Sequence, residues 1–301
     1  MGPGHPECPA RLDAIEDRLL VTGVADALER FEAPEASLTD IELAHDRLYV
    51  ASLRGLSDRL AEELLAGGPE LAQIDTDTSI NAHTWSASLR AAGAALAATD
   101  AVMAGELENA FCCVRPPGHH ATRNKAMGFC FLNNVAIAAK YALQRYKLNR
   151  VAVVDFDVHH GNGTEDILSG DPRALMVSIF QHPFYPYCGD QSPGDNMLNV
   201  PVAAYTKGMD VREIVEMMWI PRLEAFKPEM IFVSAGFDAH RDDDMGQLGL
   251  TEQDYTWITQ RIKDVARRFS KGRIVSCLEG GYMMDPLARS VEAHLRVLAD
   301  L

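Results

Sequence analysis

Short apolar runs alternate with longer amphipathic stretches along most of the chain. Five runs have the length of strands and are almost continuously apolar, as expected for strands that are buried on both faces of a parallel sheet. They lie at 110–114, 151–155, 174–180, 229–235 and 273–278. Stretches with helical spacing lie at about 10–30, 39–50, 52–66, 84–104, 131–147, 209–226, 252–269 and 285–299. This alternation predicts an α/β fold in which one mostly parallel sheet lies between helical layers.

Two interruptions in this pattern carry structural meaning. Pro221 lies inside the helical stretch 209–226, and a proline there should kink or split the helix. The segment 181–199 is rich in proline, glycine and aromatic residues, and its length is more typical of a binding loop than of a simple connection. The composition changes nowhere abruptly, so we expect residues 1–301 to form a single domain.

Composition and charge limit the kinds of molecule that we expect this protein to bind. The 301 residues include 28 basic and 43 acidic side chains, which give a net charge of −15. Nucleic-acid binding requires a basic face, so we expect no direct nucleic-acid partner; the acidic balance suits cationic ligands, or simply solubility. No leader sequence and no apolar run of about 18 residues occurs, which predicts a cytoplasmic protein without a membrane partner. A homo-oligomer is compatible with the sequence.

The six cysteines, at positions 8, 112, 113, 130, 188 and 277, form no C-x-x-C pair. This spacing argues against a zinc ribbon or a dithiol redox site. Several of the cysteines lie in apolar runs, which predicts buried free thiols in a reducing compartment.

The stretch VAVVDFDVHHGNG, residues 151–163, places two aspartates and two histidines directly after an apolar strand. Alternate residues of an extended chain share a face, so Asp155, Asp157 and His159 can project to one side. Carboxylates and an imidazole in this arrangement can hold a metal ion. The simpler alternative is a polar strand end followed by a helix start, but it leaves the cost of four crowded titratable groups without a cation to offset it.

Three further clusters follow apolar strands in the same way. RPPGHHAT (115–122) places His119 and His120 side by side, and imidazoles are suited to proton transfer near neutral pH. SAGFDAH (234–240) carries Asp238 just past a glycine, and LEGGY (278–282) carries Tyr282 after two glycines. Taken singly, the last two are weak signals, because an aspartate after a glycine is most often a turn residue.

Taken together, the four clusters point to one site, because the carboxyl ends of parallel strands meet at one edge of a sheet. That edge would gather carboxylates, imidazoles and a phenol, which is the composition of a metal-assisted hydrolase. The sequence contains no G-x-S-x-G nucleophile elbow, no H-E-x-x-H helix and no G-x-G-x-x-G phosphate loop after a strand.

Six motifs in this order resemble the histone deacetylase family, and its bacterial, class II-like branch with the acetylpolyamine amidohydrolases in particular. They are GHPECPARL (4–12), RPPGHHA (115–121), GFCFLNN (128–134), DFDVHHGNGT (155–164), SAGFDAH (234–240) and LEGGY (278–282). The resemblance covers nearly the whole chain and implies the three-layer arginase–deacetylase fold. The family's usual N-terminal edge strand would then be missing, because Met1 falls within the usual first loop.

The resemblance also implies roles for individual residues. Asp157, His159 and Asp238 are similar to the zinc ligands of the family, and His119 and His120 to its tandem histidines. Asp155 and Asn162 stand where the family has the partners of the first and the second histidine. Tyr282 matches the tyrosine that donates to the developing oxyanion. Further matches are the tunnel walls Gly128, Phe129 and Tyr185, the acetate-channel residue Arg11, the potassium ligands Asp155 and Ser178 with nearby carbonyls, and the rim residue Asp77.

The resemblance therefore predicts a zinc-dependent deacylase, with a structural potassium ion, that releases acetate from N-acetyl-lysine or a related small acylated amine. One alternative is an amidohydrolase of acetylpolyamines or other short acyl-amides; Met245, where polyamine-selective relatives carry an acidic residue, argues against it, and the acidic net charge favours it. Another is a non-catalytic acyl-lysine binder. A ureohydrolase on the same fold would need more aspartate and histidine ligands. Two aspartates and one histidine also suit iron(II) or cobalt.

Overall fold

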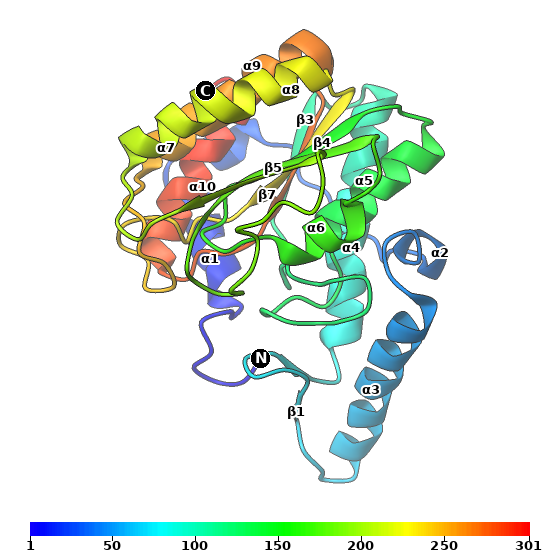
Figure 1. The fold of residues 1–301 in the computed structure, drawn as a ribbon. Helices are drawn as coiled ribbons and strands as arrows, with labels where there is room; N and C mark the ends of the chain where they lie inside the picture. Colours follow the sequence, from blue (N-terminus) through cyan, green and yellow to red (C-terminus); the bar gives the residue numbers. More distant parts are fainter.

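The computed structural model describes residues 1–301. Its main sheet has six strands: β3 (Asn109–Cys112), β4 (Val151–Asp155), β5 (Ala174–Gln181), β6 (Met197–Val202), β7 (Met230–Ala235) and β8 (Ile274–Leu278). All neighbours in this sheet pair in parallel, in the order β3-β8-β7-β4-β5-β6. The chain thus forms the predicted parallel sheet, and all carboxyl ends of its strands lie at one edge (Figure 1).

Helices cover both faces of the sheet (Figure 1). One layer consists of α2 (Leu38–Ile41), α4 (Thr84–Ala104), α5 (Asn134–Arg145) and α6 (Asn162–Leu168). The other consists of α1 (Ala10–Val21), the short 3-10 helix η1 (Val24–Ala27), α7 (Gly208–Ile214), α8 (Ile220–Phe226), α9 (Glu252–Phe269) and α10 (Met284–Leu298). The long helix α3 (Arg47–Leu65) extends away from the sheet toward the small antiparallel ribbon of β1 (Ala72–Gln73) and β2 (Ser79–Ile80).

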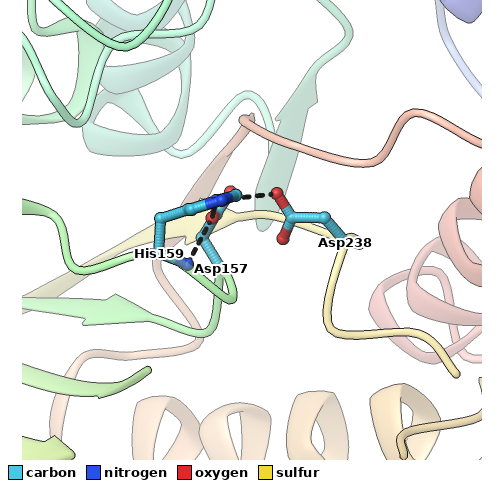
Figure 2. A group of neighbouring side chains, drawn as sticks. All are labelled: Asp157, His159 and Asp238. Atoms are coloured by element: carbon cyan, nitrogen blue, oxygen red, sulfur yellow. Dashed lines mark hydrogen bonds and ion pairs between the residues drawn. The ribbon is translucent and has the colours of Figure 1, made fainter. Parts of the chain in front are cut away.

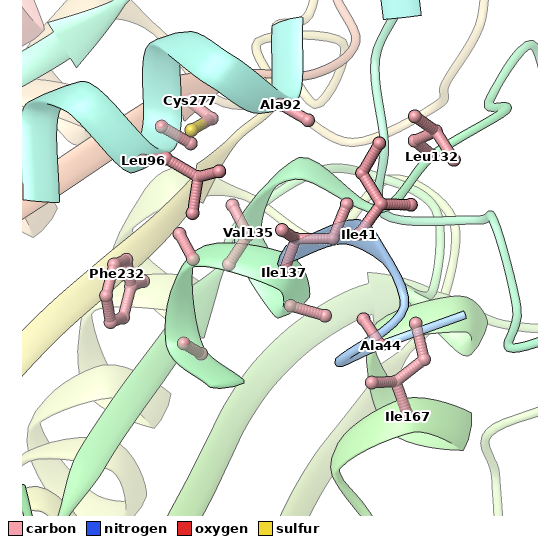
Figure 3. Packing of buried hydrophobic residues seen from close by; sticks show 14 of the residues in the cluster. Ile41, Ala44, Ala92, Leu96, Leu132, Val135, Ile137, Ile167, Phe232 and Cys277 are labelled. Atoms are coloured by element: carbon pink, nitrogen blue, oxygen red, sulfur yellow. The ribbon is translucent and has the colours of Figure 1, made fainter. Parts of the chain in front are cut away.

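The alternation of side chains along β4 divides the core into two parts. Val151 and Val153 pack in the same cluster as Leu96 of α4, whereas Val154 packs in the opposite cluster with Ile258 of α9. Figure 3 shows the first of these clusters, in which α2, α4 and α5 pack together over the sheet. Each fully buried side chain of this size contributes roughly 1.5–3 kcal/mol, so a strand that is apolar on both faces is stable only between two helical layers.

Most of the predicted elements are confirmed, but one helix break was misplaced, one strand was missed, and the helix predicted at about 10–30 ends at Val21. The helices predicted at 84–104 and 252–269 have these same bounds in α4 and α9. The helix break predicted at position 51 is wrong: α3 runs unbroken from Arg47, and the break lies just before it, where Asp46 has an extended backbone and forms the N-cap. Strand β6 was missed because Pro201 interrupts its pattern, and a proline is tolerated there because β6 is an edge strand.

The stretch around Pro221 stays helical and changes its helix type, whereas a kink or a split was predicted. The chain runs from α7 into a π-helical segment, Val215–Trp219, and then into α8, which begins one residue before Pro221. Because proline has no backbone N–H to donate into the preceding turn, the regular hydrogen-bond ladder changes there.

All six cysteines are free. Among the cysteines in apolar runs, the predicted burial is right for Cys112, Cys130 and Cys277 and wrong for Cys113, which is exposed. Cys188, in the loop after β5, is exposed as well. Among the helices, none combines the length and the apolar character that are needed to cross a bilayer.

Candidate active site

The order of the strands brings the four sequence clusters together. Strands β3, β8, β7 and β4 are consecutive in the sheet, and each is followed within a few residues by one cluster. The first cluster follows β4, the tandem histidines follow β3, Asp238 follows β7 and Tyr282 follows β8. The predicted meeting of these clusters at one edge of the sheet is therefore confirmed.

Asp157, His159 and Asp238 form the one group in the structure whose donor atoms suit a metal ion (Figure 2). Their donor atoms all lie within 4.8 Å of one another, and all three residues are buried. Nδ1 of His159 lies 3.0 Å from Oδ1 of Asp157 and 3.2 Å from Oδ2 of Asp238. The three side chains come from two different strand ends, β4 and β7.

Backbone groups and two glycines hold these carboxylates in place. The N–H of Gly280 donates to Oδ2 of Asp157 at 2.8 Å, and the N–H of Val158 donates to Oδ1 of Asp238 at 2.9 Å. A side chain at Gly280 would collide with Asp238, and one at Gly236 would collide with Asp157. The glycines are required here because the backbone of neighbouring loops approaches the carboxylates closely.

The chemistry of this group fits a divalent cation. Oδ2 of Asp238 is buried and accepts no hydrogen bond, and Nδ1 of His159 lies 3.2 Å from it. Burial, together with the neighbouring Asp157, raises the pKa of Asp238 to about 7. Two buried carboxylates beside one imidazole are costly in their charged form, and a divalent ion bound by all three offsets that cost. We infer that the residues fit such an ion.

The adjacent histidines 119 and 120 have different partners. Nδ1 of His119 lies 3.0 Å from Oδ2 of Asp155, and Nδ1 of His120 lies 2.8 Å from Oδ1 of Asn162. An amide oxygen only accepts, so Nδ1 of His120 carries the proton and Nε2 keeps its lone pair. Their ring centroids are 4.1 Å apart, and Gly128 packs so closely on His120 that a side chain there would meet the ring.

The surroundings shift the pKa values of the two histidines in opposite directions. Burial lowers the pKa of His119, but the carboxylates of Asp157 and Asp155 outweigh burial and raise it well above its usual value. Burial and the charges of His119 and His159 lower the pKa of His120 well below its usual value. These opposite shifts favour the protonated form of His119 and the neutral form of His120.

Tyr282 lies between the aromatic ring of Phe129 and a buried arginine. Its ring makes an edge contact with Phe129, with centroids 5.8 Å apart, and the guanidinium of Arg11 lies 4.8 Å from the ring centroid. Arg11 is fully buried and donates to the carbonyl oxygens of Gly281 and Glu279 at 2.6 and 2.5 Å. The arginine thus fixes the two-glycine turn that precedes the tyrosine.

Aromatic side chains pack against the histidines, along the candidate approach for a substrate. The ring of Tyr185 lies 5.2 Å from that of His120, and the ring of Phe184 stacks on His159 at 5.5 Å. The backbone N–H of Phe129 donates to the hydroxyl of Thr78, which in turn donates to Asp77 at 2.7 Å. The structure thus connects the candidate rim residue Asp77 to the candidate tunnel wall.

Ser178 lies away from this approach, inside the sheet. It pairs in register with Asp155 across β4 and β5, and its side chain is buried. The two residues predicted to bind potassium are therefore neighbours behind the histidines.

Three buried residues near the site were missed in the sequence. Glu279 is fully buried, and its Oε2 accepts from the N–H groups of Gly118 and His119 at 2.7 and 3.1 Å. His45 is buried between the carbonyl of Thr122 and the N–H of Asn133. Asp243 is also buried. Only Glu279 had a sequence signal, as an isolated charge at the end of an apolar strand.

Comparisons with known proteins agree on one family. The family model "Histone deacetylase domain" matches residues 5–298. "Type-2 histone deacetylase 2" of Dictyostelium discoideum is 45% identical over 247 residues, which are 74% of this chain and 14% of that protein's length. "Histone deacetylase-like amidohydrolase" of Pseudomonas aeruginosa is 36% identical over 286 residues, which are 93% of this chain and 73% of that protein. The crystal structure of the HDA15 HD domain superposes with a TM-score of 0.90 and 32% identity, covering 99% of this chain and 86% of that one, which confirms the arginase–deacetylase fold.

Proposed function

The chain belongs to the histone deacetylase family, and from this we propose that it is a zinc-dependent deacylase. Its proposed substrate is N-acetyl-lysine or a related small acylated amine, and its proposed product is acetate with the free amine. The observation that carries the proposal is the position of His120: Asn162 holds its Nδ1, and its ring lies beside a group of carboxylates and an imidazole that fits a divalent ion.

We assign the metal to Asp157, His159 and Asp238. Three protein ligands leave room for a water and for the substrate, as catalytic zinc sites require. When bound, the zinc ion supplies Lewis acidity toward the amide carbonyl and toward the attacking water. We assign Asp155 and Ser178, with neighbouring carbonyl groups, to a structural potassium ion.

His120 acts as the general base and then as the general acid. Its Nδ1–H is held by Asn162, so Nε2 takes the proton from the attacking water and later delivers a proton to the departing amine nitrogen. An asparagine partner supports this role better than an aspartate would, because it orients the ring without adding a negative charge that would favour the protonated imidazole. His119, paired with Asp155, carries the positive charge that stabilises the developing negative charge.

Tyr282 donates its phenol hydrogen to the oxygen that becomes negative when water adds to the amide. Burial raises the pKa of Tyr282 well above its usual value, so the phenol keeps its proton at neutral pH and remains a donor. A donor of this kind stabilises the transition state more than the ground state, and its loss typically costs about 100- to 1000-fold in rate.

The approach to these residues suits an acylated alkylamine. The aromatic rings of Phe129 and Tyr185 can enclose a methylene chain on either side, and Asp77 is connected to Phe129 through the hydroxyl of Thr78. A carboxylate at that position can accept a hydrogen bond from the part of the substrate that stays outside. We assign Gly128 to this wall and Arg11 to the path by which acetate leaves.

Kinetics over a panel of substrates test the proposal. The panel contains an acetyl-lysine peptide, trifluoroacetyl-lysine, acetylputrescine and acetylspermidine, each with and without a hydroxamate inhibitor. We expect hydroxamate-sensitive turnover of the lysine substrates. Preferred turnover of the acetylpolyamines would favour the polyamine amidohydrolase, and binding of acetyl-lysine without any turnover would identify a non-catalytic binder.

A further inference from the structure

One buried carboxylate holds the backbone of Tyr282. The N–H groups of Tyr282 and Met283 both donate to Oδ2 of Asp243, at 2.7 and 3.0 Å, and Oδ1 accepts from the N–H of Met245 at 2.9 Å. We propose that Asp243 is a positioning residue that sets the place from which the phenol of Tyr282 acts. This inference rests on the proposed function, because it concerns the group assigned there as the oxyanion donor.

The tyrosine needs such a contact because of the turn that precedes it. Gly281 has a φ of 115°, a region open to glycine, and α10 begins only at Met284. Before Tyr282 the turn is fixed by Arg11 and by the bond from Gly280 to Asp157. Beyond Gly281 the backbone N–H groups go to Asp243. A small displacement of this backbone is carried to the phenol at the far end of the side chain, and misplacement by about 1 Å can cost about 100-fold in rate.

Asp243 is buried and is therefore not an exposed charge at the rim of the site. Asp243 is only 5% exposed, whereas the side chain of its neighbour Asp242 is 52% exposed. Asp243 lies in the same loop as Asp238, the loop that follows β7. One loop thus supplies a proposed metal ligand, Asp238, and the acceptor that holds the backbone of Tyr282. The loop therefore sets the position of Tyr282 relative to Asp238.

A double-mutant cycle with Tyr282→Phe tests whether Asp243 acts through the phenol. In the wild-type background, we expect Asp243→Ala to lower kcat about 10- to 100-fold with little change in KM. In the Tyr282→Phe background, the same substitution should lower kcat by less than about twofold, because the phenol is already gone. Equal losses in both backgrounds, or an unchanged kcat in the wild-type background, would overturn the proposal.

Amide hydrogen exchange gives a readout that does not depend on activity. We expect the amides of Tyr282 and Met283 to exchange at least about tenfold faster in Asp243→Ala, because their acceptor is removed. Unchanged exchange would overturn the inference. If instead Tyr282→Phe alone leaves kcat unchanged, the proposed role of the tyrosine fails, and the exchange experiment still decides whether Asp243 holds the backbone.

Three more variants separate positioning from charge and from stability. Asp243→Asn keeps an acceptor oxygen and should lose less than about threefold in kcat. Asp243→Glu keeps the charge but lengthens the side chain, so it should lose as much as alanine; if the alanine variant does not fold, Asp243→Glu completes the same cycle. Asp254→Ala is the matched control, since Asp254 is 6% exposed and accepts the N–H of Thr251 at the start of α9, and it should lose stability but keep kcat.

Discussion

His119 and His120 are neighbours in the sequence with ring centroids 4.1 Å apart, yet one ring is held by a carboxylate and the other by an amide oxygen. Asp155 stabilises the cationic form of His119, whereas Asn162 orients His120 without adding a negative charge. The carboxylates around His119 outweigh its burial and raise its pKa, whereas burial and the charges of His119 and His159 lower the pKa of His120. These opposite shifts suit two identical side chains to different parts in the proposed reaction.

Replacement of each histidine should therefore have a different result. We expect His120→Ala to lower kcat by about 100- to 10,000-fold at unchanged metal content, because the group that moves the proton is lost. His119→Ala should retain more activity, since that ring contributes electrostatically. Steady-state kinetics with metal analysis by mass spectrometry measure both effects. A His120→Ala enzyme with nearly wild-type kcat would remove His120 from the mechanism.

Tyr282→Phe removes one hydroxyl and leaves the aromatic contacts with Phe129 and Arg11. We expect kcat to fall about 100- to 1000-fold while KM and metal content change little, because the donor acts mainly in the transition state. The measurement is kcat and KM on an acetyl-lysine peptide. Unchanged turnover would exclude the phenol as the oxyanion donor.

Removal of the metal should abolish turnover reversibly. We expect a strong chelator to eliminate activity and added zinc to restore it, and the chelated protein to melt at a lower temperature because the ion binds only the folded state. Asp238→Ala should give the same loss and should not be restored by zinc. Full activity after complete chelation would contradict the assignment of the metal to Asp157, His159 and Asp238.

A glycine substitution tests the close packing around the metal group. A side chain at Gly280 would meet Asp238 and Asp157, so Gly280→Ala should lose both metal content and activity. Gly55→Ala, in the exposed middle of α3 with open space around it, should instead raise the free energy of unfolding by about 0.5–1 kcal/mol. Normal metal content in Gly280→Ala would show that the loops can move apart.

The buried residue His294 makes stability depend on pH. Burial lowers its pKa to about 3, from an ordinary value of 6.5. Below pH 6.5, His294 binds a proton in the unfolded chain but stays neutral in the folded protein. The free energy of unfolding therefore decreases as the pH falls from 6.5 toward 3, by about 1.4 kcal/mol per pH unit. Urea unfolding at pH 7 and pH 5 measures this slope, which should be smaller in His294→Gln; an equal slope would contradict the prediction.

The sequence identified the elements of the sheet and the residues of the candidate site because both have local signatures. Buried parallel strands are continuously apolar, and polar clusters follow them directly, as in the segment from Val151 to His159. The edge strand β6 was missed because an edge tolerates Pro201. The extent of the domain, the cytoplasmic location, the potassium ion and the oligomeric state stay predictions.

The tertiary structure decided which buried groups meet. No local pattern shows that Asp243 accepts from Tyr282, which lies 39 positions further along the chain, or that Glu279 holds the backbone of His119 across 160 positions. The local sequence also does not predict the hydrogen-bond partners of His45, or that β8 lies between β3 and β7 in the sheet. A buried polar group is stable only with a partner of fitting geometry, and that partner comes from whichever segment the packing of the whole chain brings near. Apolar periodicity is a property of one segment, whereas such partnerships are properties of the packed chain.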